Sequence, residues 1–338
     1  EIHERLVGSE MCIRDRGRVM DMKIVVLDGC AANSGDISWD SIGKYGELTV
    51  YDRTDRSEVV SRIGDAEIIT TNKTVIDRAV IEACPNLRYI GVLATGYNVV
   101  DVEAAHEHGI VVTNVPAYST DAVAQFTFAL LLELANRVGA HDASVKDGGW
   151  VRSKDFSYSV MPTMELAGKT MGIIGYGSIG MKVAEIAHAF GMRVLVNSRT
   201  RKALPDGDWI SWAERDELFA QSDVISIHCP LFPETEGMID RSAIGRMKKT
   251  TFIINTARGG CIVEKDLADA LNEERIAGAA VDVIAQEPMA ADNPLLTAKN
   301  VIITPHIAWA PKEVRERLLN IAGGNIEAFL NGKPVNTV

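Results

Sequence analysis

Short hydrophobic runs alternate with amphipathic stretches along the first third of the chain. The stretches Asp77–Ala83 and Asp101–His108 have helical patterns. Five β-branched runs flank these stretches, at residues 23–28, 47–52, 66–70, 87–95 and 110–114. Strands that alternate with helices indicate parallel β-α-β units. A denser apolar segment, Thr120–Asn136, predicts a long helix buried against another subunit or at a domain boundary.

The same alternation begins again after Gly168. Six more strands are predicted at residues 169–177, 193–198, 223–230, 250–259, 276–283 and 300–306. A last amphipathic helix, Lys312–Leu330, follows the sixth strand and is expected to cross back to the first domain. The sequence therefore predicts an α/β protein with two Rossmann-like, doubly wound parallel-sheet domains. A dinucleotide-binding domain (117–309) is inserted into a split substrate domain (20–116 plus 310–338).

Residues 1–19 differ from the rest of the chain. They show no sustained amphipathic period, and they precede two possible start methionines, Met20 and Met22. Their four acidic residues argue against an organellar transit peptide. We interpret this segment as a non-native or disordered extension.

Composition excludes several classes of function. The 338 residues carry a net charge of −11, which makes nucleic acid a poor partner because its phosphates would be repelled. No run of about 18 apolar residues is present, so no membrane span is expected. The five cysteines form no C-x-x-C pair, which indicates free thiols in a reducing, cytoplasmic compartment and no metal site.

A glycine-rich turn at residues 175–180, with the sequence G-Y-G-S-I-G, follows the predicted strand Thr170–Ile174. Gly175 permits the tight turn, Gly177 lets a pyrophosphate approach the backbone, and Gly180 allows close packing of helix and strand. Free amides at the start of the helix would face the phosphates. This combination of strand, turn and helix predicts a dinucleotide site.

The end of the next strand lacks the acidic residue that binds the ribose 2′-hydroxyl of NAD. Ser198 and Arg199 stand there, with Arg201 and Lys202 nearby. These cations could neutralise a 2′-phosphate, or they could be solvated loop charges. The missing acid favours NADP(H) over NAD(H).

Three polar residues follow three of the predicted strands: Arg258, Glu287 and His306. The carboxyl ends of parallel strands line the ligand crevice, so these residues should converge. Reduction of a 2-keto acid needs a cation for the carboxylate, an acid for the carbonyl oxygen and a group that orients this acid. We assign these roles to Arg258, His306 and Glu287 respectively.

The segments GYGSIG, NTARG, DV-x3-EP and TPHIAW, in this order, resemble the D-isomer-specific 2-hydroxyacid dehydrogenase family. The stretches ATGYNVVDVEAA and NVPAYSTDAVAQFTFALLLE are similar to its glycerate dehydrogenase/hydroxypyruvate reductase branch. The resemblance implies the same catalytic trio and a dimer formed around residues 120–136. It implies that the backbone amides of Ala94, Thr95 and Gly96 bind the substrate carboxylate, and that Asp282 contacts the nicotinamide amide. It also implies a set of residues that line the dinucleotide: Ser178, Ile179, Cys229, Pro230, Thr256 and Ala257.

We therefore expect a homodimeric oxidoreductase that reduces hydroxypyruvate, and also glyoxylate, to the D-2-hydroxy acid. One alternative is a D-lactate-type reductase of other 2-keto acids. The other is a non-catalytic dinucleotide-sensing protein of the same fold.

Overall fold

The computed structural model describes residues 22–338, which form two compact units. Unit 1 contains the described residues up to Tyr118 together with Ala310–Val338, and unit 2 is Ser119–Trp309. The chain first leaves unit 1 two residues beyond the boundary drawn from the sequence. The extension predicted at residues 1–19 lies outside the described residues.

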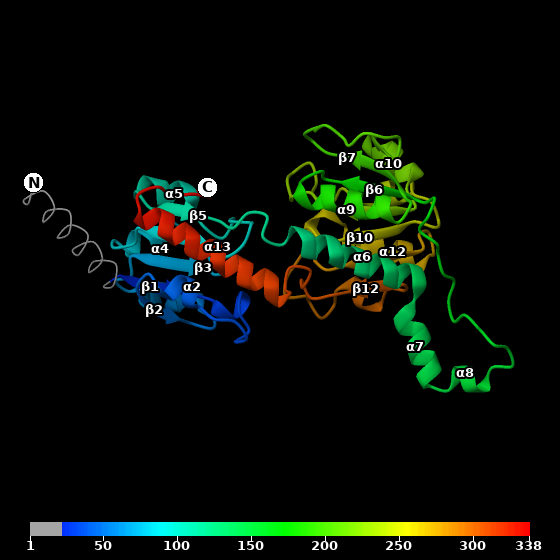
Figure 1. Ribbon diagram of the computed structural model, residues 1–338, viewed down its shortest axis with the longest axis horizontal. Coiled ribbons are helices and arrows are strands. Elements are labelled where there is room, and N and C mark those ends of the chain that lie inside the picture. Colours follow the sequence, from blue (N-terminus) through cyan, green and yellow to red (C-terminus); the bar gives the residue numbers. More distant parts are fainter. Residues whose placement is uncertain (1–21) are drawn as a thin grey trace, which may run out of the picture. The chain divides into compact units, whose positions relative to one another are not determined.

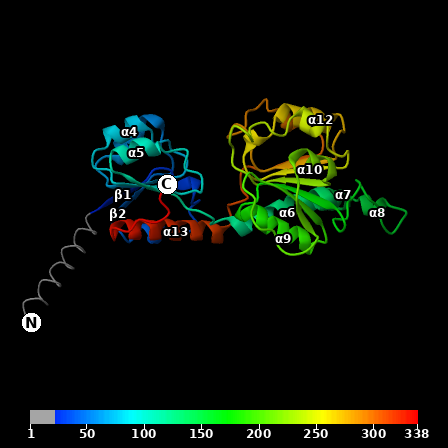
Figure 2. The same cartoon turned by 90° about the horizontal axis from the view of Figure 1, so that it is seen from above.

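Unit 1 is built on a five-stranded parallel sheet with the strand order β2-β1-β3-β4-β5. Its strands are β1 (Lys23–Val26), β2 (Glu47–Val50), β3 (Ile68–Thr71), β4 (Tyr89–Val92) and β5 (Val111–Thr113). Its helices are α2 (Asp40–Gly43), α3 (Val59–Ile63), α4 (Arg78–Ala83), α5 (Val102–Glu107) and α13 (Lys312–Leu330). Helices α4 and α5 cover one face of this sheet, and α13 covers the other (Figure 2). The predicted return of the last helix to the first sheet is therefore observed.

Unit 2 contains a seven-stranded parallel sheet with the order β12-β11-β10-β9-β6-β7-β8. Its strands are β6 (Thr170–Ile174), β7 (Arg193–Asn197), β8 (Ile210–Trp212), β9 (Val224–Ile227), β10 (Phe252–Asn255), β11 (Gly278–Val281) and β12 (Val301–Ile303). Its helices are α6 (Thr120–Asn136), α7 (Val138–Lys146), α8 (Gly149–Arg152), α9 (Ser178–Ala189), α10 (Arg215–Gln221), α11 (Arg241–Ile244) and α12 (Glu264–Asn272). The two doubly wound α/β sheets confirm the predicted fold class (Figure 1).

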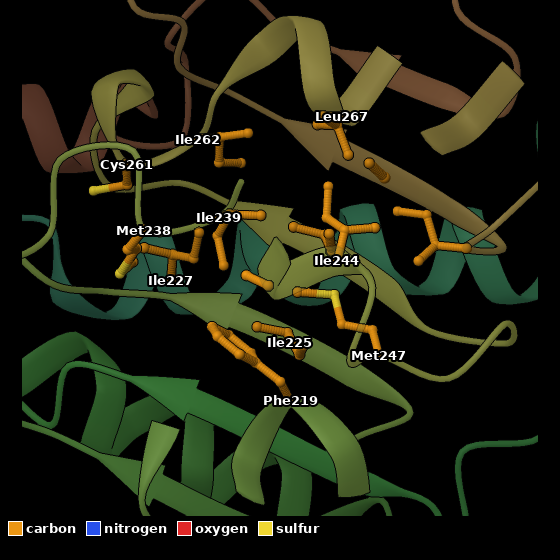
Figure 3. Close-up of a cluster of buried hydrophobic side chains, with 14 of the residues drawn as sticks. Phe219, Ile225, Ile227, Met238, Ile239, Ile244, Met247, Cys261, Ile262 and Leu267 are labelled. Atoms are coloured by element: carbon orange, nitrogen blue, oxygen red, sulfur yellow. The ribbon is translucent and has the colours of Figure 1, made fainter. Parts of the chain in front are cut away.

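Two hydrophobic layers hold the sheet of unit 2 between helices. One layer joins the sheet to α10, α11 and α12, and it includes Phe219, Ile225 and Leu267 (Figure 3). The other joins the sheet to α6 and α9, and Leu131 and Val183 are fully buried in it. Most of the apolar side chains of α6 are thus buried inside its own unit.

The segment after α6 extends away from the sheet of unit 2 and contains α7 and α8 (Figure 1). Several of its apolar side chains are exposed: Trp150 is 54% exposed, Val151 89% and Phe156 90%.

Within residues 22–338, no helix combines the length and the apolar character that a membrane span requires.

Candidate active site

The sheet of unit 2 brings together the three strands that precede the predicted catalytic residues. Strand β11 pairs with β10 on one side and with β12 on the other. Asn255, Val281 and Ile303 end these strands in aligned register. The loops that carry Arg258, Glu287 and His306 therefore leave the same edge of the sheet from neighbouring positions.

His306 and Glu287 are in direct contact. The Nδ1 atom of His306 lies 2.8 Å from Oε2 of Glu287, and each side chain is about one-third exposed. An ionised carboxylate only accepts hydrogen bonds, so Nδ1 donates in this pair. Nε2 of His306 is thereby left for proton exchange with a substrate. The structure thus brings these two predicted residues into hydrogen-bond contact.

The loop that carries His306 is organised by the buried carboxylate of Asp282. The Oδ1 atom accepts hydrogen bonds from Thr304 Oγ1 (2.6 Å) and the Ile307 amide (2.9 Å), and Oδ2 accepts one from the Ala308 amide (2.9 Å). The sequence indicated only a cofactor contact for Asp282. The structure gives it a second task, because its carboxylate fixes residues on both sides of His306.

Arg258 follows β10 in a turn that is shaped by Asn255. The Asn255 side chain donates to the Arg258 carbonyl (2.9 Å) and accepts from the Ala257 amide (3.0 Å). The Arg258 side chain is exposed and donates to the Ala257 carbonyl (2.7 Å). Its guanidinium can therefore be reached by a carboxylate from solvent.

The glycine turn fits a dinucleotide. Gly175 has a φ of +99°, and a side chain there would come within 2.6 Å of the His228 carbonyl. A Cβ atom at Gly177 would meet nothing within 4 Å, whereas one at Gly180 would lie 2.1 Å from the Gly175 carbonyl oxygen. Gly177 thus leaves open space at the start of α9, and Gly180 lets the helix approach the strand. This is the cradle that a pyrophosphate requires. Ser178 opens α9, and Ile179 packs against the core beneath it.

The two arginines predicted near the ribose both follow β7, but they contact different partners. Arg201 forms an ion pair with Glu214 at 2.8 Å. Arg199 lies over the ring of Phe232, with 4.7 Å between its guanidinium carbon and the ring centroid. Both Arg199 and the preceding Ser198 lie directly beyond the strand. Arg201 is therefore engaged by a carboxylate, whereas Arg199 stacks on an aromatic ring.

The remaining predicted cofactor residues follow β9 and β10. Cys229 and Pro230 come directly after His228, and Thr256 bonds through its hydroxyl to that of Thr127 on α6 (3.1 Å). Burial lowers the pKa of His228 to about 3, and its Nε2 atom is bonded to the Ser226 hydroxyl at 2.8 Å. His228 is therefore held neutral at the base of the turn.

One contact near these residues was missed from the sequence. The thiols of Cys229 and Cys261 interact with each other, and their hydrogen bond lowers the pKa of the Cys261 thiol, which Arg258 lowers further. The two residues are 32 positions apart and share no sequence motif. Only the turn after β10 brings them together.

Ala94, Thr95 and Gly96 lie in unit 1, one residue beyond the end of β4. The Ala94 carbonyl accepts from the Val115 amide at 3.0 Å, and the Thr95 hydroxyl donates to the Val115 carbonyl at 2.9 Å. This segment is thus pinned to the chain that follows β5.

Comparisons with known proteins identify relatives along most of the chain. The family described as "D-isomer specific 2-hydroxyacid dehydrogenase, NAD binding domain" matches residues 128–308. A hydroxypyruvate reductase of Blautia hydrogenotrophica is 53% identical over 320 residues, which cover 94% of this chain and 99% of the relative. A glycerate dehydrogenase of Methylorubrum extorquens is 38% identical over 322 residues and covers 94% and 99% of the two chains. The crystal structure of an NADPH-dependent glyoxylate/hydroxypyruvate reductase from Sinorhizobium meliloti matches with a TM-score of 0.80 and 26% identity, and covers 94% and 97%.

Proposed function

The chain belongs to the D-isomer-specific 2-hydroxyacid dehydrogenase family, and we propose that it reduces hydroxypyruvate, and also glyoxylate, to the D-2-hydroxy acid. The observation that carries this proposal is the His306–Glu287 pair, which lies beside the loop of Arg258 at one edge of the sheet. The Blautia relative supports hydroxypyruvate as the substrate, since it is similar over nearly its whole length.

The residues of this chain divide the reaction among them. Arg258 binds the substrate carboxylate through paired hydrogen bonds. Protonated His306 gives its proton to the carbonyl oxygen, and Glu287 orients the ring and stabilises its positive form. The reduced nicotinamide supplies the hydride when it is bound. The backbone amides of Ala94, Thr95 and Gly96 are proposed as further donors to the carboxylate.

We assign the cofactor as NADP(H) in preference to NAD(H). No acidic residue stands directly after β7, where Ser198 and Arg199 are found instead. A carboxylate at this position would repel a 2′-phosphate, whereas the Arg199 guanidinium attracts one. Asp282, Cys229, Pro230, Thr256 and Ala257 are proposed to line the rest of the dinucleotide site.

The proposal is tested by initial rates with NADPH and NADH on four substrates: hydroxypyruvate, glyoxylate, pyruvate and phenylpyruvate. We expect the highest kcat/KM for hydroxypyruvate with NADPH. A higher kcat/KM for pyruvate or phenylpyruvate would favour the D-lactate-type alternative. Absence of turnover on all four would favour a dinucleotide-sensing protein.

We also propose a cytoplasmic homodimer. The exposed apolar side chains of the segment after α6, including Val151 and Phe156, offer a surface that a second copy would cover. Light scattering of the purified protein measures the mass directly. A protein that stays monomeric at micromolar concentration contradicts the dimer.

A further inference from the structure

The loop that carries Glu287 has no regular structure of its own. Residues 282–293 connect β11 to a short 3-10 turn at Pro294–Thr297, and the part from Ile284 to Asn293 is called loop 284–293 below. Glu287 lies in the middle of this loop and is bonded to His306. Contacts from outside the loop are therefore expected to help hold the carboxylate in place.

One side chain contacts both ends of this loop. The Oε1 atom of Glu264 accepts a hydrogen bond from the Ala285 amide at 2.7 Å, and Oε2 accepts one from the Asn293 side chain at 2.8 Å. Ala285 and Asn293 are eight positions apart, so a single carboxylate closes the loop at its base. The two bonds use both oxygens of Glu264.

Glu264 is itself attached to a rigid element. It is the first residue of α12, which packs into the core through Leu267 (Figure 3) and through Leu271. These side chains are 0% and 1% exposed. A buried helix is a firm support for a side chain that has to fix a loop. The position of Glu264 is thus set by the core and not by the loop.

The base of the loop also packs closely against the segment that carries Arg258. A Cβ atom at Gly259 would lie 1.9 Å from the Ile284 carbonyl carbon, so only glycine allows this approach. The Ile284 amide in turn points to Oε1 of Glu287 at 3.4 Å. The start of the loop is therefore held between Gly259 and Glu264.

We propose that Glu264 is a positioning residue for the proton-transfer pair. By closing the base of loop 284–293, it fixes Glu287 at the distance at which Glu287 orients His306. The inference rests on the proposed function, in which these two residues transfer the substrate proton. Loss of the clamp should reduce turnover, while Arg258 continues to bind the substrate carboxylate.

The first test compares Glu264→Ala with Asp266→Ala. Asp266 is a matched control, because it also lies in the first turn of α12 and accepts a backbone amide, that of Arg241, at 2.8 Å. We expect Glu264→Ala to lower kcat roughly 10- to 100-fold, as misplacement of a catalytic group does, with little change in KM. Its pH–rate profile should move, whereas Asp266→Ala should keep the parent kcat and profile. Glu264→Gln keeps an acceptor for the Ala285 amide, so its kcat should lie between those of the parent and Glu264→Ala.

The second test needs no turnover. Hydrogen–deuterium exchange of the peptide that contains residues 284–293 should become faster in Glu264→Ala and stay unchanged in Asp266→Ala. Parent-like exchange in Glu264→Ala, or equal losses of kcat in both variants, would overturn the positioning role. If the parent itself turns over no 2-keto acid, the proposed function fails, while the exchange experiment still decides whether Glu264 holds the loop.

Discussion

The hydroxyl of Thr304 lies 2.6 Å from the carboxylate of Asp282. Thr304 stands two residues before His306 in the chain. Asp282 is 1% exposed, so its oxygens depend on protein donors. The side chain that aligns the His306 loop is thus fixed by a hydroxyl from the strand end that leads into this loop.

Thr304→Val, which keeps the shape and removes the hydroxyl donor, should destabilise the protein. The expected loss is about 1.5–3 kcal/mol in the free energy of unfolding, the range for hydrogen bonds to charged groups. Urea unfolding measures it. Thr304→Ser retains the donor and serves as the control, and equal stability of the Val and Ser variants would contradict the role of this bond.

His306→Ala should lower kcat by roughly 10²- to 10⁴-fold, the range for loss of a general acid. Steady-state kinetics with hydroxypyruvate measure the change. His188→Ala is the control, because His188 is an exposed histidine of the same unit, stacked on Trp209. A kcat for His306→Ala within about threefold of the parent would exclude His306 as the acid.

Arg258→Ala should raise KM for the 2-keto acid more than it lowers kcat, because it removes the anchor for the carboxylate. Arg258→Lys keeps the charge but not the planar fork, and it should recover only part of the affinity. The ratio of the two KM values checks this expectation. An unchanged KM in both variants would show that groups other than Arg258 bind the substrate carboxylate.

Much of this site could be predicted because strand ends carry it. Arg258, Glu287 and His306 follow β-branched runs, and a parallel sheet brings the ends of such runs to one edge. The three-residue strand β8 was missed, because one of its residues is exposed and one half-buried, and no hydrophobic run marks it.

The supporting contacts could not be predicted from the sequence. Glu264 begins a helix, and its sequence gives no sign of the loop that it clamps 21 positions later. Asp282 has the sequence context of a cofactor contact, yet its carboxylate also accepts from Thr304, Ile307 and Ala308. Such contacts depend on side-chain geometry across neighbouring loops, which hydrophobic periodicity does not encode.

Arg199→Ala should weaken the binding of NADPH more than that of NADH, because only NADPH carries the 2′-phosphate. The expected change is a roughly 10-fold or greater rise in KM for NADPH, as for a lost charge-assisted contact of about 1.4 kcal/mol or more. Arg201→Ala is the matched control, since Arg201 is engaged by Glu214. A rise in KM for NADPH that occurs only in Arg201→Ala would show that Arg201, and not Arg199, contacts the phosphate.

His228 should make the stability of the protein depend on pH. Burial lowers its pKa in the folded state to about 3, from an ordinary value of 6.5, so the folded form stays neutral while the unfolded form gains a proton below pH 6.5. The unfolded state then binds more protons, and stability is lost as the pH falls from 6.5 towards 3. Between pH 6.5 and 5.0 the loss from this group is at most about 2 kcal/mol. Urea unfolding of the parent and of His228→Gln at several pH values isolates it, because other titrating groups are common to both proteins. The two stability curves should run parallel above pH 8 and diverge below pH 6.5, with the parent falling more steeply; curves that stay parallel down to pH 5 would show that His228 is protonated in the fold.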